Sequence, residues 1–596
     1  MNLTPEQQTA ARCPDNLLIT ACPGSGKTRV IIARLLGEID RLRGTPKTAA
    51  CITYTNTAVQ EIEHRTAQFL EPGDERHFTV STIHAFCLNA ILRPFGWLAP
   101  GFNSALKVIT RDHPDFEEIA RHAAAQVNYH NLDHWDYDAF SNLALDAQGN
   151  IVGVAAGNAA VRRAAPYYWR RCDELGFVDF GRILYTSYCL LHDHPFIVHS
   201  VATRYPAFLV DEFQDTSELQ VEILKLVHAH GNCRLFAVGD PAQSIYGFAG
   251  ARPELAEPFA EHVGARTDLT LTGNFRSSGH VVDQAERLLP RHPRMQAVGP
   301  NRNDPQVPLL VSTLDTFHAI TEAFLPKLQE LAIPLGDAAI LAREWGPLFD
   351  LSRRLRAFGT PIVGPGARPY RRSRLFASLA EQLCAYTASP LTHGIRQLEN
   401  ALFHAVLDAT AEARLEVYAY DGRIALTRMM REARRLAEQG GAVRWLDDMS
   451  RATAEILLKS GFVDANQARL FFASVQEMKA DMLRQGVDLD NLTIDDLGMF
   501  ANPQAALRLG TIFFAKGREY KAVALINMRE GKIPNYRARD AAALADERRI
   551  LYVGLTRAER LLMYVAEPGE ARSRFLTDLG FDLSPPQGVR RPMRLR

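Results

Sequence analysis

The chain has 596 residues, which is too long for one hydrophobic core, and domains of roughly 100–200 residues predict about three to five units. Apolar residues make up 47% of the chain and charged residues 23%, which excludes wholesale disorder and a fibrous repeat. Lysine plus arginine and aspartate plus glutamate both total 68, so the formal net charge is zero and any nucleic-acid site must be local.

The cysteines and the N-terminus indicate the compartment. Eight cysteines occur without a CxxC pair, which predicts neither a zinc site nor a disulfide framework and favours a reducing environment. The N-terminal residues lack the basic flank and apolar run of a secretion signal, and no apolar stretch approaches the ~20 residues that span a bilayer. We therefore expect a cytoplasmic protein without a membrane partner.

The clearest local pattern lies near the N-terminus. Residues 17–20 form an apolar run typical of a buried strand, and the loop Ala-Cys-Pro-Gly-Ser-Gly-Lys-Thr and an apolar helical pattern follow. Backbone N–H groups of such a loop bind phosphate oxygens, Lys27 reaches the β- and γ-phosphates, and the Thr28 hydroxyl binds Mg²⁺. A chance glycine turn is the alternative. The nucleotide-binding residues predicted in this loop are Ala21, Gly24, Ser25, Gly26, Lys27 and Thr28.

A second apolar run ends in two carboxylates. Residues 207–210 precede Asp211 and Glu212. Asp211 is placed to hold Mg²⁺, and Glu212 can orient or deprotonate the attacking water, because phosphoryl transfer asks the protein mainly for positioning and charge stabilisation. An Asp-Glu pair is often only surface charge, but the apolar run before it and residues 213–216 after it favour a catalytic pair.

A third strand-like run, residues 233–238, leads into a polar segment. There Gln243 could hydrogen-bond the γ-phosphate and so report its presence. Tyr246 and Phe248 are two residues apart, so they share one face if the segment is extended, and they could stack on bases. Packing of both rings in the core is the alternative.

Four further segments, together with those above, match a known set of sequence motifs in the same order. Residues 3–8, 54–61, 81–86 and 176–180, taken with the segments above, resemble in order the motifs of a superfamily 1 helicase of the UvrD/Rep type. In this resemblance Gln7 matches the glutamine that reads adenine. The resemblance also implies that four residues of the first motor contact DNA: Tyr54, Asn56, Thr82 and His84.

The second half of the chain continues the resemblance. Asn274 to Ser277 resembles the motif in which Arg276 would touch the γ-phosphate, while Phe275 and Arg29 would sandwich the adenine.

Two later motifs complete the set. In residues 511–520, Thr511 would contact DNA and Glu519 the ribose, and in residues 547–558 the resemblance makes Arg557 the arginine finger.

Two positions depart from the family pattern. Phe513 stands where the family usually has histidine, and Ala249 stands where a basic residue is common. Both departures put polar contacts near the DNA strand in doubt and leave the ATP chemistry unaffected.

The resemblance implies an α/β fold with two RecA-like P-loop NTPase motor domains, each interrupted by a mainly helical insertion. The phosphate loop and Arg557 lie far apart in the sequence yet must meet at one nucleotide, which calls for two motors. The expected ranges are 1–90 and 201–265 for the first motor with an insertion at 91–200, and 266–370 and 506–596 for the second motor with an insertion at 371–505.

The leading hypothesis is an ATP-driven motor that translocates on single-stranded DNA and unwinds duplex DNA, with ATP and Mg²⁺ as cofactors. The resemblance implies 3′-to-5′ travel and a 3′-tailed duplex as substrate. One alternative is a DNA-stimulated ATPase that senses DNA for a partner nuclease or a defence or repair protein, with little unwinding of its own. Another is a DNA-binding scaffold with an inactive ATP site. Repair, replication restart, plasmid maintenance and phage defence all stay open.

Overall fold

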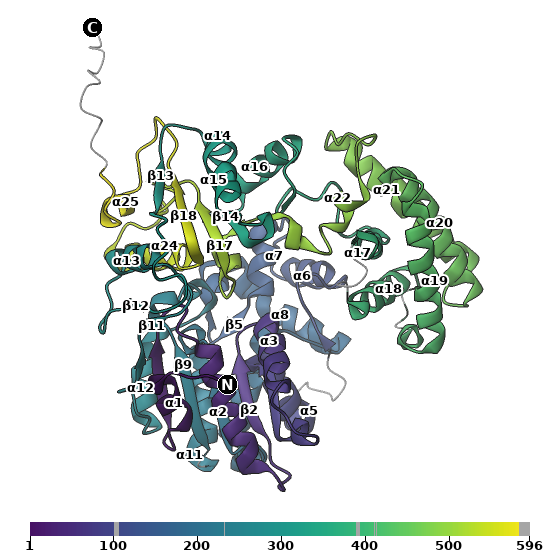
Figure 1. Ribbon diagram of the computed structural model, residues 1–596. Coiled ribbons are helices and arrows are strands. Elements are labelled where there is room, and N and C mark those ends of the chain that lie inside the picture. The colour runs from purple at the N-terminus through teal and green to yellow at the C-terminus, as the bar shows by residue number, and fades with distance from the viewer. Residues whose placement is uncertain (100–106, 232, 389–393, 411, 413, 583–596) are drawn as a thin grey trace. The chain divides into compact units, whose positions relative to one another are not determined.

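The computed structural model describes residues 1–99, 107–231, 233–388, 394–410, 412 and 414–582 (Figure 1). The chain divides into two compact units. Unit 1 comprises Met1–Pro305 and Ala541–Thr556, and unit 2 comprises Gln306–Asp540 and Arg557–Arg596. Each unit is therefore assembled from two stretches that are distant in the sequence.

Unit 1 is built on a six-stranded sheet in the order β10-β1-β9-β8-β2-β3. All of its strand pairs are parallel, so the carboxyl ends of the strands lie at one edge, where ligands of such sheets bind. The strands are β1 (Leu17–Ala21), β2 (Ala49–Thr53), β3 (Phe78–Thr82), β8 (Ala207–Val210), β9 (Arg234–Gly239) and β10 (Thr270–Leu271).

Both faces of this sheet are covered. Ala49 and Cys51 of β2 pack in one apolar cluster with helix α2 (Lys27–Leu42), while Ala50 and Ile52 pack in a second cluster on the other face. This alternation follows from the two-residue period of a strand. The helices outside the insertion of unit 1 are α1 (Pro5–Arg12), α2 (Lys27–Leu42), α3 (Asn56–Ala67), α4 (Ile83–Cys87), α5 (Arg93–Phe95), α11 (Glu218–Gly231), α12 (Ala256–His262), α13 (Gly279–Leu288) and α24 (Ala541–Leu555).

A mainly helical segment with its own core interrupts unit 1 between β3 and β8. Phe116, Phe140 and Tyr168 are buried at its centre. Helices α9 (Phe180–Asp193) and α10 (Pro195–Arg204), which follow this segment in the chain, pack instead in the apolar cluster of the sheet with Ala50 and Phe208. The helices of the segment itself are α6 (Phe116–Ala125), α7 (His134–Ser141) and α8 (Ala159–Leu175). Its short strands pair as β4 (Lys107–Val108) with β7 (Phe177–Val178) and β5 (Ala144–Leu145) with β6 (Ile151–Val152).

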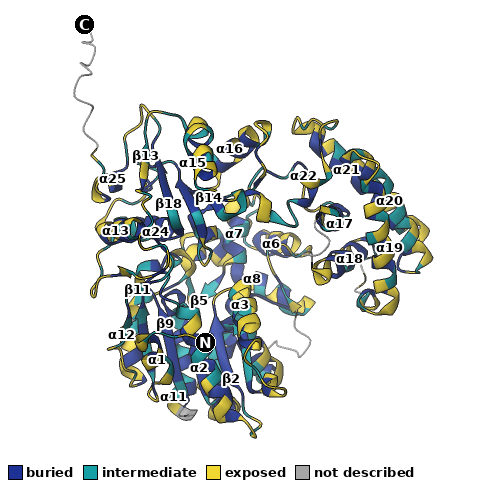
Figure 2. Cartoon of the chain, viewed as in Figure 1, coloured by how far each residue is buried: buried dark blue, intermediate teal, exposed yellow. Residues whose placement is uncertain are grey.

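Unit 2 contains a second six-stranded parallel sheet, in the order β13-β18-β17-β14-β16-β15. Figure 2 shows the strands of both sheets mostly in the colour of buried residues. The strands are β13 (Leu309–Val311), β14 (Ala338–Ala342), β15 (Ile362–Val363), β16 (Leu507–Thr511), β17 (Tyr520–Leu525) and β18 (Ala558–Val565). The helices next to this sheet are α14 (Thr316–His318), α15 (Leu325–Glu330), α16 (Gly346–Ala357), α23 (Ile512–Ala515) and α25 (Phe575–Asp578).

A helical subdomain with a separate core lies between β15 and β16 in the chain. Trp445 is buried there and its Nε1 donates to the Ala433 carbonyl at 3.0 Å. Its helices are α17 (Ala377–Ala388), α18 (Ile395–Thr410), α19 (Tyr420–Ala437), α20 (Ala442–Lys459), α21 (Ala465–Arg484) and α22 (Ile494–Gly498). Across the described part of the chain, no helix has both the length and the apolar character that crossing a bilayer requires.

The prediction of an α/β chain is confirmed by these parallel sheets. The contacts of the chain place residues 266–305 and 541–556 in unit 1, because α24 packs on α13 and Arg548 donates to the Leu288 carbonyl at 3.1 Å. This grouping differs from the predicted domain ranges, which assign both stretches to the second motor. The RecA-like character and the motor boundaries stay predictions.

Candidate functional site

The loop between β1 and α2 has the backbone geometry of a phosphate-binding turn. Gly24 and Gly26 adopt φ values of 67° and 81°, in the left-handed region. A Cβ on Gly24 would lie 2.8 Å from the Asn274 amide oxygen, and one on Gly26 would lie 2.8 Å from the Gln7 amide nitrogen. Both positions therefore need glycine. The loop leads directly into the N-terminus of α2, whose first residue is Lys27, so the free N–H groups and the helix dipole favour an anion there.

Gln7 holds the backbone of this loop. Its Nε2 donates to the Ser25 carbonyl at 2.8 Å, and its Oε1 accepts from the Thr4 backbone N–H at 3.1 Å. Ser25 Oγ is buried and has no hydrogen-bond partner among the described residues. A buried hydroxyl without a partner costs stability, so a phosphate oxygen at this loop would satisfy it. The residue expected to read adenine thus also supports the phosphate loop, a contact the sequence did not indicate.

Residues 274–277 lie against the same loop. The Phe275 backbone N–H donates to the Gly24 carbonyl at 2.9 Å, and the Asn274 side chain accepts from the backbone of Arg276 at 2.9 Å. Arg276 also donates to the Thr556 carbonyl at 3.4 Å. The structure therefore brings Phe275 and Arg276 to the phosphate loop, and their implied contacts with adenine and the γ-phosphate stay predictions. The predicted partner of Phe275, Arg29, contacts the Asn2 carbonyl at 3.5 Å.

Asp211 is buried directly after β8. Burial, and then the charge of Glu212, raises the pKa of Asp211 well above its usual range, while the Lys27 ammonium lowers it. A divalent cation would stabilise the ionised carboxylate. One carboxylate together with the Thr28 hydroxyl suits Mg²⁺, which in such sites keeps waters and phosphate oxygens as its other ligands. The residues present therefore fit this ion.

Glu212 has a strained backbone, with φ of 51° in the left-handed region. Its Oε2 accepts from Gln214 Nε2 at 2.6 Å. Tyr54, Asp211, Glu212 and Asp215 line a cavity of about 20 Å³, which is room for one water. The structure thus places a water-sized space beside both carboxylates.

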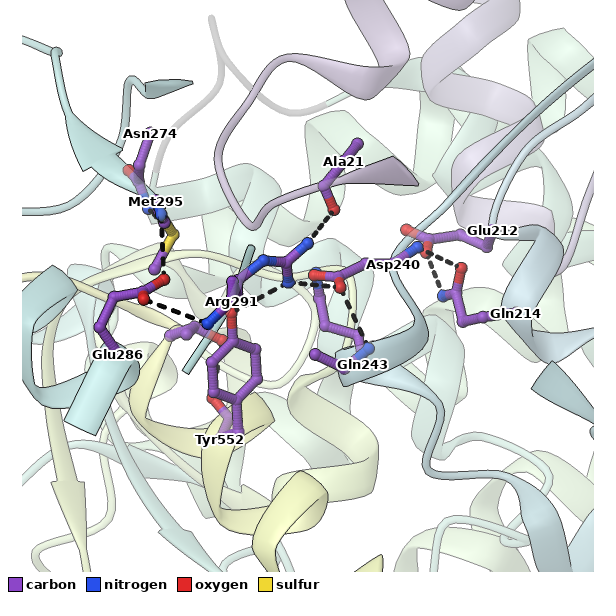
Figure 3. A network of polar contacts seen from close by, with 12 residues as sticks. Ala21, Glu212, Gln214, Asp240, Gln243, Asn274, Glu286, Arg291, Met295 and Tyr552 are labelled. Carbon is purple, nitrogen blue, oxygen red and sulfur yellow. Dashed lines mark hydrogen bonds and ion pairs between the residues drawn. The ribbon is translucent and has the colours of Figure 1, made fainter. Parts of the chain in front are cut away.

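A buried polar network extends from Glu212 to the predicted phosphate sensor (Figure 3). The Gln214 amide oxygen accepts from the Asp240 backbone N–H at 2.8 Å, and Asp240 accepts from Gln243 Nε2 at 2.6 Å. Asp240 is fully buried and forms an ion pair of 2.6 Å with Arg291. Gln243 and Glu212, predicted separately from two strand ends, therefore belong to one connected set of side chains.

Arg291 connects this network to two other elements. It donates to the Ala21 carbonyl of the phosphate loop and to the Tyr552 hydroxyl of α24, both at 3.3 Å (Figure 3). Four residues of this network were not predicted from the sequence: Arg291, Asp240, Gln214 and Tyr552. Asp240 directly follows an apolar strand, and Gln214 and Tyr552 lie in the segments 213–216 and 547–558, so the sequence carried a signal for these three. Arg291 lies in a segment with no recognisable pattern.

Three predicted DNA-contacting rings gather after the strand ends of unit 1. Tyr54 follows β2, and its ring stacks on Tyr246 with centroids 5.1 Å apart and an interplanar angle of 18°. Phe248 meets Tyr246 edge-on at 6.1 Å and is 55% exposed, which rules out the alternative that it packs in the core. Ala249, next to Phe248, ends the same short turn, η7 (Gly247–Ala249).

The other DNA contacts predicted in unit 1 lie on neighbouring helices. Asn56 is the exposed first residue of α3, and Thr82 caps α4 by accepting from the Ala85 N–H at 3.3 Å. Burial lowers the pKa of His84 to about 4, and the exposed ring of Phe180 meets it edge-on at 5.0 Å. Phe180 was not predicted as a site residue, although it lies in one of the matched segments, residues 176–180.

Three predicted site residues belong to unit 2. Arg557 is buried before β18 and donates to the Arg518 carbonyl at 3.4 Å. Glu519 lines a cavity of about 560 Å³ at the amino end of β17. Thr511 caps α23 at the opposite end of the sheet, where it accepts from the Phe514 N–H at 3.2 Å. The roles implied for these three residues stay predictions.

Two models of one helicase family match the chain and together span more than half of it. The UvrD/REP helicase N-terminal domain matches residues 3–264, which contain the phosphate loop and the carboxylate pair. The UvrD-like helicase C-terminal domain matches residues 459–567, which contain Arg557.

Full-length relatives align over nearly the whole chain. The ATP-dependent DNA helicase Rep of Salmonella typhimurium is 24% identical, over 95% of this chain and 90% of the relative. The putative ATP-dependent DNA helicase YjcD of Bacillus subtilis is 27% identical, over 94% and 79%. The ATP-dependent DNA helicase PcrA of Leuconostoc citreum is 25% identical, over 95% and 83%. With the phosphate loop, the carboxylate pair and these matches, the chain is an enzyme of the UvrD/Rep family of helicases.

Proposed function

We propose that the chain is an ATP-dependent DNA helicase that couples hydrolysis to translocation on single-stranded DNA and to unwinding of a 3′-tailed duplex. One observation carries the proposal. The strand ends of a single sheet hold both the phosphate loop with its buried network and a ring cluster in which the exposed Tyr54 and Phe248 contact the half-buried Tyr246. An ATP-driven motor needs both surfaces on one domain, because ATP hydrolysis must change how tightly that domain binds the strand.

The residues of unit 1 divide the chemistry between them. Lys27 and the loop N–H groups bind the β- and γ-phosphates, and Glu212 orients the attacking water, for which the adjacent cavity has room. Gln243 senses the γ-phosphate through its amide, which Asp240 holds in place. When bound at Thr28 and Asp211, Mg²⁺ neutralises charge on the phosphates.

Arginines complete the proposed mechanism. Arg276, held at the phosphate loop through Asn274, neutralises charge on the γ-phosphate, and Arg557 acts as the arginine finger. Phe275 and Arg29 enclose the adenine, with Gln7 reading its edge and Glu519 bonding the ribose.

On the DNA side, the three rings of unit 1 stack on bases. Stacking contributes ~1–3 kcal/mol per base whatever the base, which suits a motor that must pass over any sequence. Asn56, Thr82, His84 and Thr511 add contacts that position the strand. Direction of travel is proposed as 3′-to-5′, and the cytoplasm is the proposed compartment.

The test compares ATPase rates with and without oligo(dT), followed by strand displacement on 3′-tailed and 5′-tailed duplexes. We expect DNA to stimulate hydrolysis and only the 3′-tailed duplex to be unwound. Unwinding from the 5′ tail alone would contradict the proposed 3′-to-5′ polarity. Hydrolysis that DNA does not stimulate would contradict the proposal that the chain is a DNA-dependent motor.

A second candidate is a DNA-stimulated ATPase that acts with a partner nuclease, for example in phage defence. The apolar side chains of Phe513 and Ala249, where polar groups are usual, favour it. Stimulated hydrolysis without displacement of either duplex would support this alternative.

A further inference from the structure

A single arginine, Arg291, contacts three separate elements of unit 1 at once (Figure 3). Its guanidinium forms the ion pair with Asp240 at 2.6 Å and donates to the Ala21 carbonyl and to the Tyr552 hydroxyl, both at 3.3 Å. Ala21 is the last residue of β1, Asp240 follows β9, and Tyr552 lies in α24. Because one planar group binds all three, their relative positions depend on Arg291.

The backbone of Arg291 is fixed by hydrogen bonds of its own. Arg291 lies just after α13, and its N–H donates to the Glu286 carboxylate at 3.3 Å. The same carboxylate accepts from the Met295 N–H at 3.0 Å, and the Met295 sulfur accepts from Asn274 Nδ2 at 3.6 Å. Asn274 in turn accepts from the backbone N–H of Arg276. The segment that carries Arg291 is therefore tied to the segment proposed to contact the γ-phosphate.

The Asp240 carboxylate connects Arg291 to the proposed γ-phosphate sensor. One of its oxygens, Oδ1, accepts from Arg291 and from the Ala242 N–H, and the other, Oδ2, accepts from Gln243 Nε2 at 2.6 Å. The Asp240 side chain is fully buried and Gln243 is buried as well, so bulk water does not compete for these bonds. The orientation of the Gln243 amide therefore depends on Asp240, and that of Asp240 depends on Arg291.

A second branch of hydrogen bonds leads from Asp240 to Glu212. The Asp240 N–H donates to the Gln214 amide oxygen at 2.8 Å, and the Gln214 amide nitrogen donates to the Glu212 carboxylate at 2.6 Å. A Cβ on Gly239 would lie 2.7 Å from that amide oxygen, so the Gln214 side chain is closely packed. Because the two bonds use the two ends of one planar amide, a shift of Asp240 would also move the Glu212 carboxylate.

We propose that Arg291 is a positioning residue for ATP hydrolysis, which orients Gln243 and Glu212 through Asp240. This rests on the proposed function, in which Gln243 contacts the γ-phosphate and Glu212 orients the attacking water. Phosphoryl transfer depends mainly on positioning and charge stabilisation, so a small displacement of either group lowers the rate without weakening the binding of ATP. A purely structural ion pair would instead affect folding and leave the rate of the folded protein unchanged.

Arg291→Lys separates these two roles. Lysine keeps a positive charge next to Asp240, but its single ammonium cannot also bind Ala21 and Tyr552 in the fixed geometry of a guanidinium. We expect turnover of the full chain to fall about 10- to 100-fold, with and without oligo(dT), because a misplacement of about 1 Å can cost ~10²-fold. The Kd for the non-hydrolysable analogue AMP-PNP should stay within about threefold of the wild-type value, because the lost interaction acts on the rate. The Tm should stay close to that of the wild type.

Two further variants make the test specific. Arg294→Lys, three residues along the chain in an exposed pair with Asp283, is the matched control and should turn over like the wild type. Tyr552→Phe removes one hydroxyl and leaves the pair of Arg291 with Asp240 intact. The Tyr552→Phe protein should therefore fold normally, while its turnover falls about fivefold for the loss of one hydrogen bond.

A double-mutant cycle tests whether Arg291 acts through the sensor. Gln243→Ala removes the amide that Asp240 holds. Because part of the effect of Arg291→Lys passes through this amide, the two substitutions together should lower turnover clearly less than the product of their single effects. A combined loss equal to that product would show that Arg291 acts independently of Gln243 and would overturn the proposal.

The outcomes separate the positioning role from the proposed function. Wild-type turnover in both Arg291→Lys and Tyr552→Phe would overturn the positioning role and leave the proposed function standing. Equal losses of AMP-PNP affinity and turnover in an Arg291→Lys protein that melts like the wild type would make Arg291 a binding residue and overturn the role as well.

Two results need a second measurement. If Arg291→Lys melts well below the wild type, the rate of Tyr552→Phe decides, and an unchanged rate there makes Arg291 purely structural. If oligo(dT) does not stimulate hydrolysis by the wild-type chain, the proposed function fails, and the rates without DNA still test the role of Arg291.

Discussion

Both parallel sheets of this enzyme carry exposed aromatic rings at the carboxyl ends of their strands, but the edge of unit 1 also carries a buried polar network. The edge of unit 1 carries a buried network that runs from Ala21 through Arg291, Asp240 and Gln214 to Glu212. The corresponding edge of unit 2 carries half-exposed rings and cations, with Trp345 and Phe514 at its centre.

The difference lies in the loops and not in the strands. Both sheets have six parallel strands, and one strand of each, the edge strand β3 in unit 1 and the inner strand β16 in unit 2, ends in a threonine that caps a short helix. Phosphate chemistry needs side chains that are held rigidly and kept from water, while gripping a moving strand needs faces that remain open. The predictions below test whether the two edges divide the work in this way.

The largest effect is expected at Arg557, the residue of unit 2 proposed to act on the phosphate chemistry of unit 1. Arg557→Ala should lower DNA-stimulated turnover by about 10³-fold or more, because arginine fingers contribute on the order of 10³–10⁵. ATP affinity should change far less. Steady-state ATPase and nucleotide titration measure both. A loss below threefold would restrict Arg557 to its contact with the Arg518 carbonyl.

Glu212 tests the buried edge alone. Glu212→Gln keeps the shape of the side chain but removes the carboxylate, so turnover should fall about 10²–10⁴-fold while ATP still binds. Lys27→Ala should instead impair binding and turnover together. Glu432→Gln, which removes a carboxylate paired with Arg435 in the helical subdomain, is the control. Near-normal turnover of Glu212→Gln would remove Glu212 from the role of base.

Arg291 tests whether the network is also a structural element. Arg291→Met leaves the Asp240 carboxylate buried without its cation, which costs about 3–5 kcal/mol of folding stability. Thermal melting should show this loss, and the control Arg294→Met, which breaks an exposed pair with Asp283, should change stability by no more than ~1 kcal/mol. Equal melting of the two variants would contradict the importance of the buried pair.

Phe248 tests the open part of the unit 1 edge. Phe248→Ala should weaken the interaction with one base by about 1–3 kcal/mol, and translocation should fall far more than the ATPase rate without DNA. Stopped-flow translocation and thermal melting measure the two effects. A large drop in melting temperature with a parallel loss of basal ATPase activity would contradict the proposed stacking of Phe248 on a base.

The smallest effect concerns pH. Burial lowers the pKa of His84 from 6.5 to about 4, so the fold favours the neutral ring. Between pH 6.5 and about 4 the unfolded chain binds a proton at His84 and the folded chain does not. The stability that His84 contributes is therefore fully present above pH 6.5 and is lost as the pH falls through about 4. His84→Gln should therefore lose less stability between pH 6.5 and 4 than the wild type does, measured by urea unfolding at several pH values. The exposed His262→Gln should behave like the wild type. At the matching place in unit 2, Phe513 cannot titrate.

The sequence alone was sufficient to predict the site residues whose position depends on their near neighbours in the chain. The glycines of the phosphate loop, Lys27 and Thr28 follow one another in a strand, loop and helix order, so the chain itself dictates their geometry. Asp211 and Gln243 each follow an apolar run, and parallel strands bring such positions to one edge. The spacing of Tyr246 and Phe248 predicted a shared face only for an extended segment and left core packing open, and the structure instead has the short turn η7 there.

The tertiary structure alone decided which distant residues complete these sites. Arg291 reaches Asp240, Ala21 and Tyr552 across separations of 51 to 270 residues, and nothing in the local pattern around it indicates a buried cation. Gln7 supports the phosphate loop because its helix packs on α2, and Trp345 meets Phe514 because β14 and β16 are neighbours. Local sequence specifies strands, turns and caps, but pairings between elements depend on strand order and packing, which a single sequence does not state.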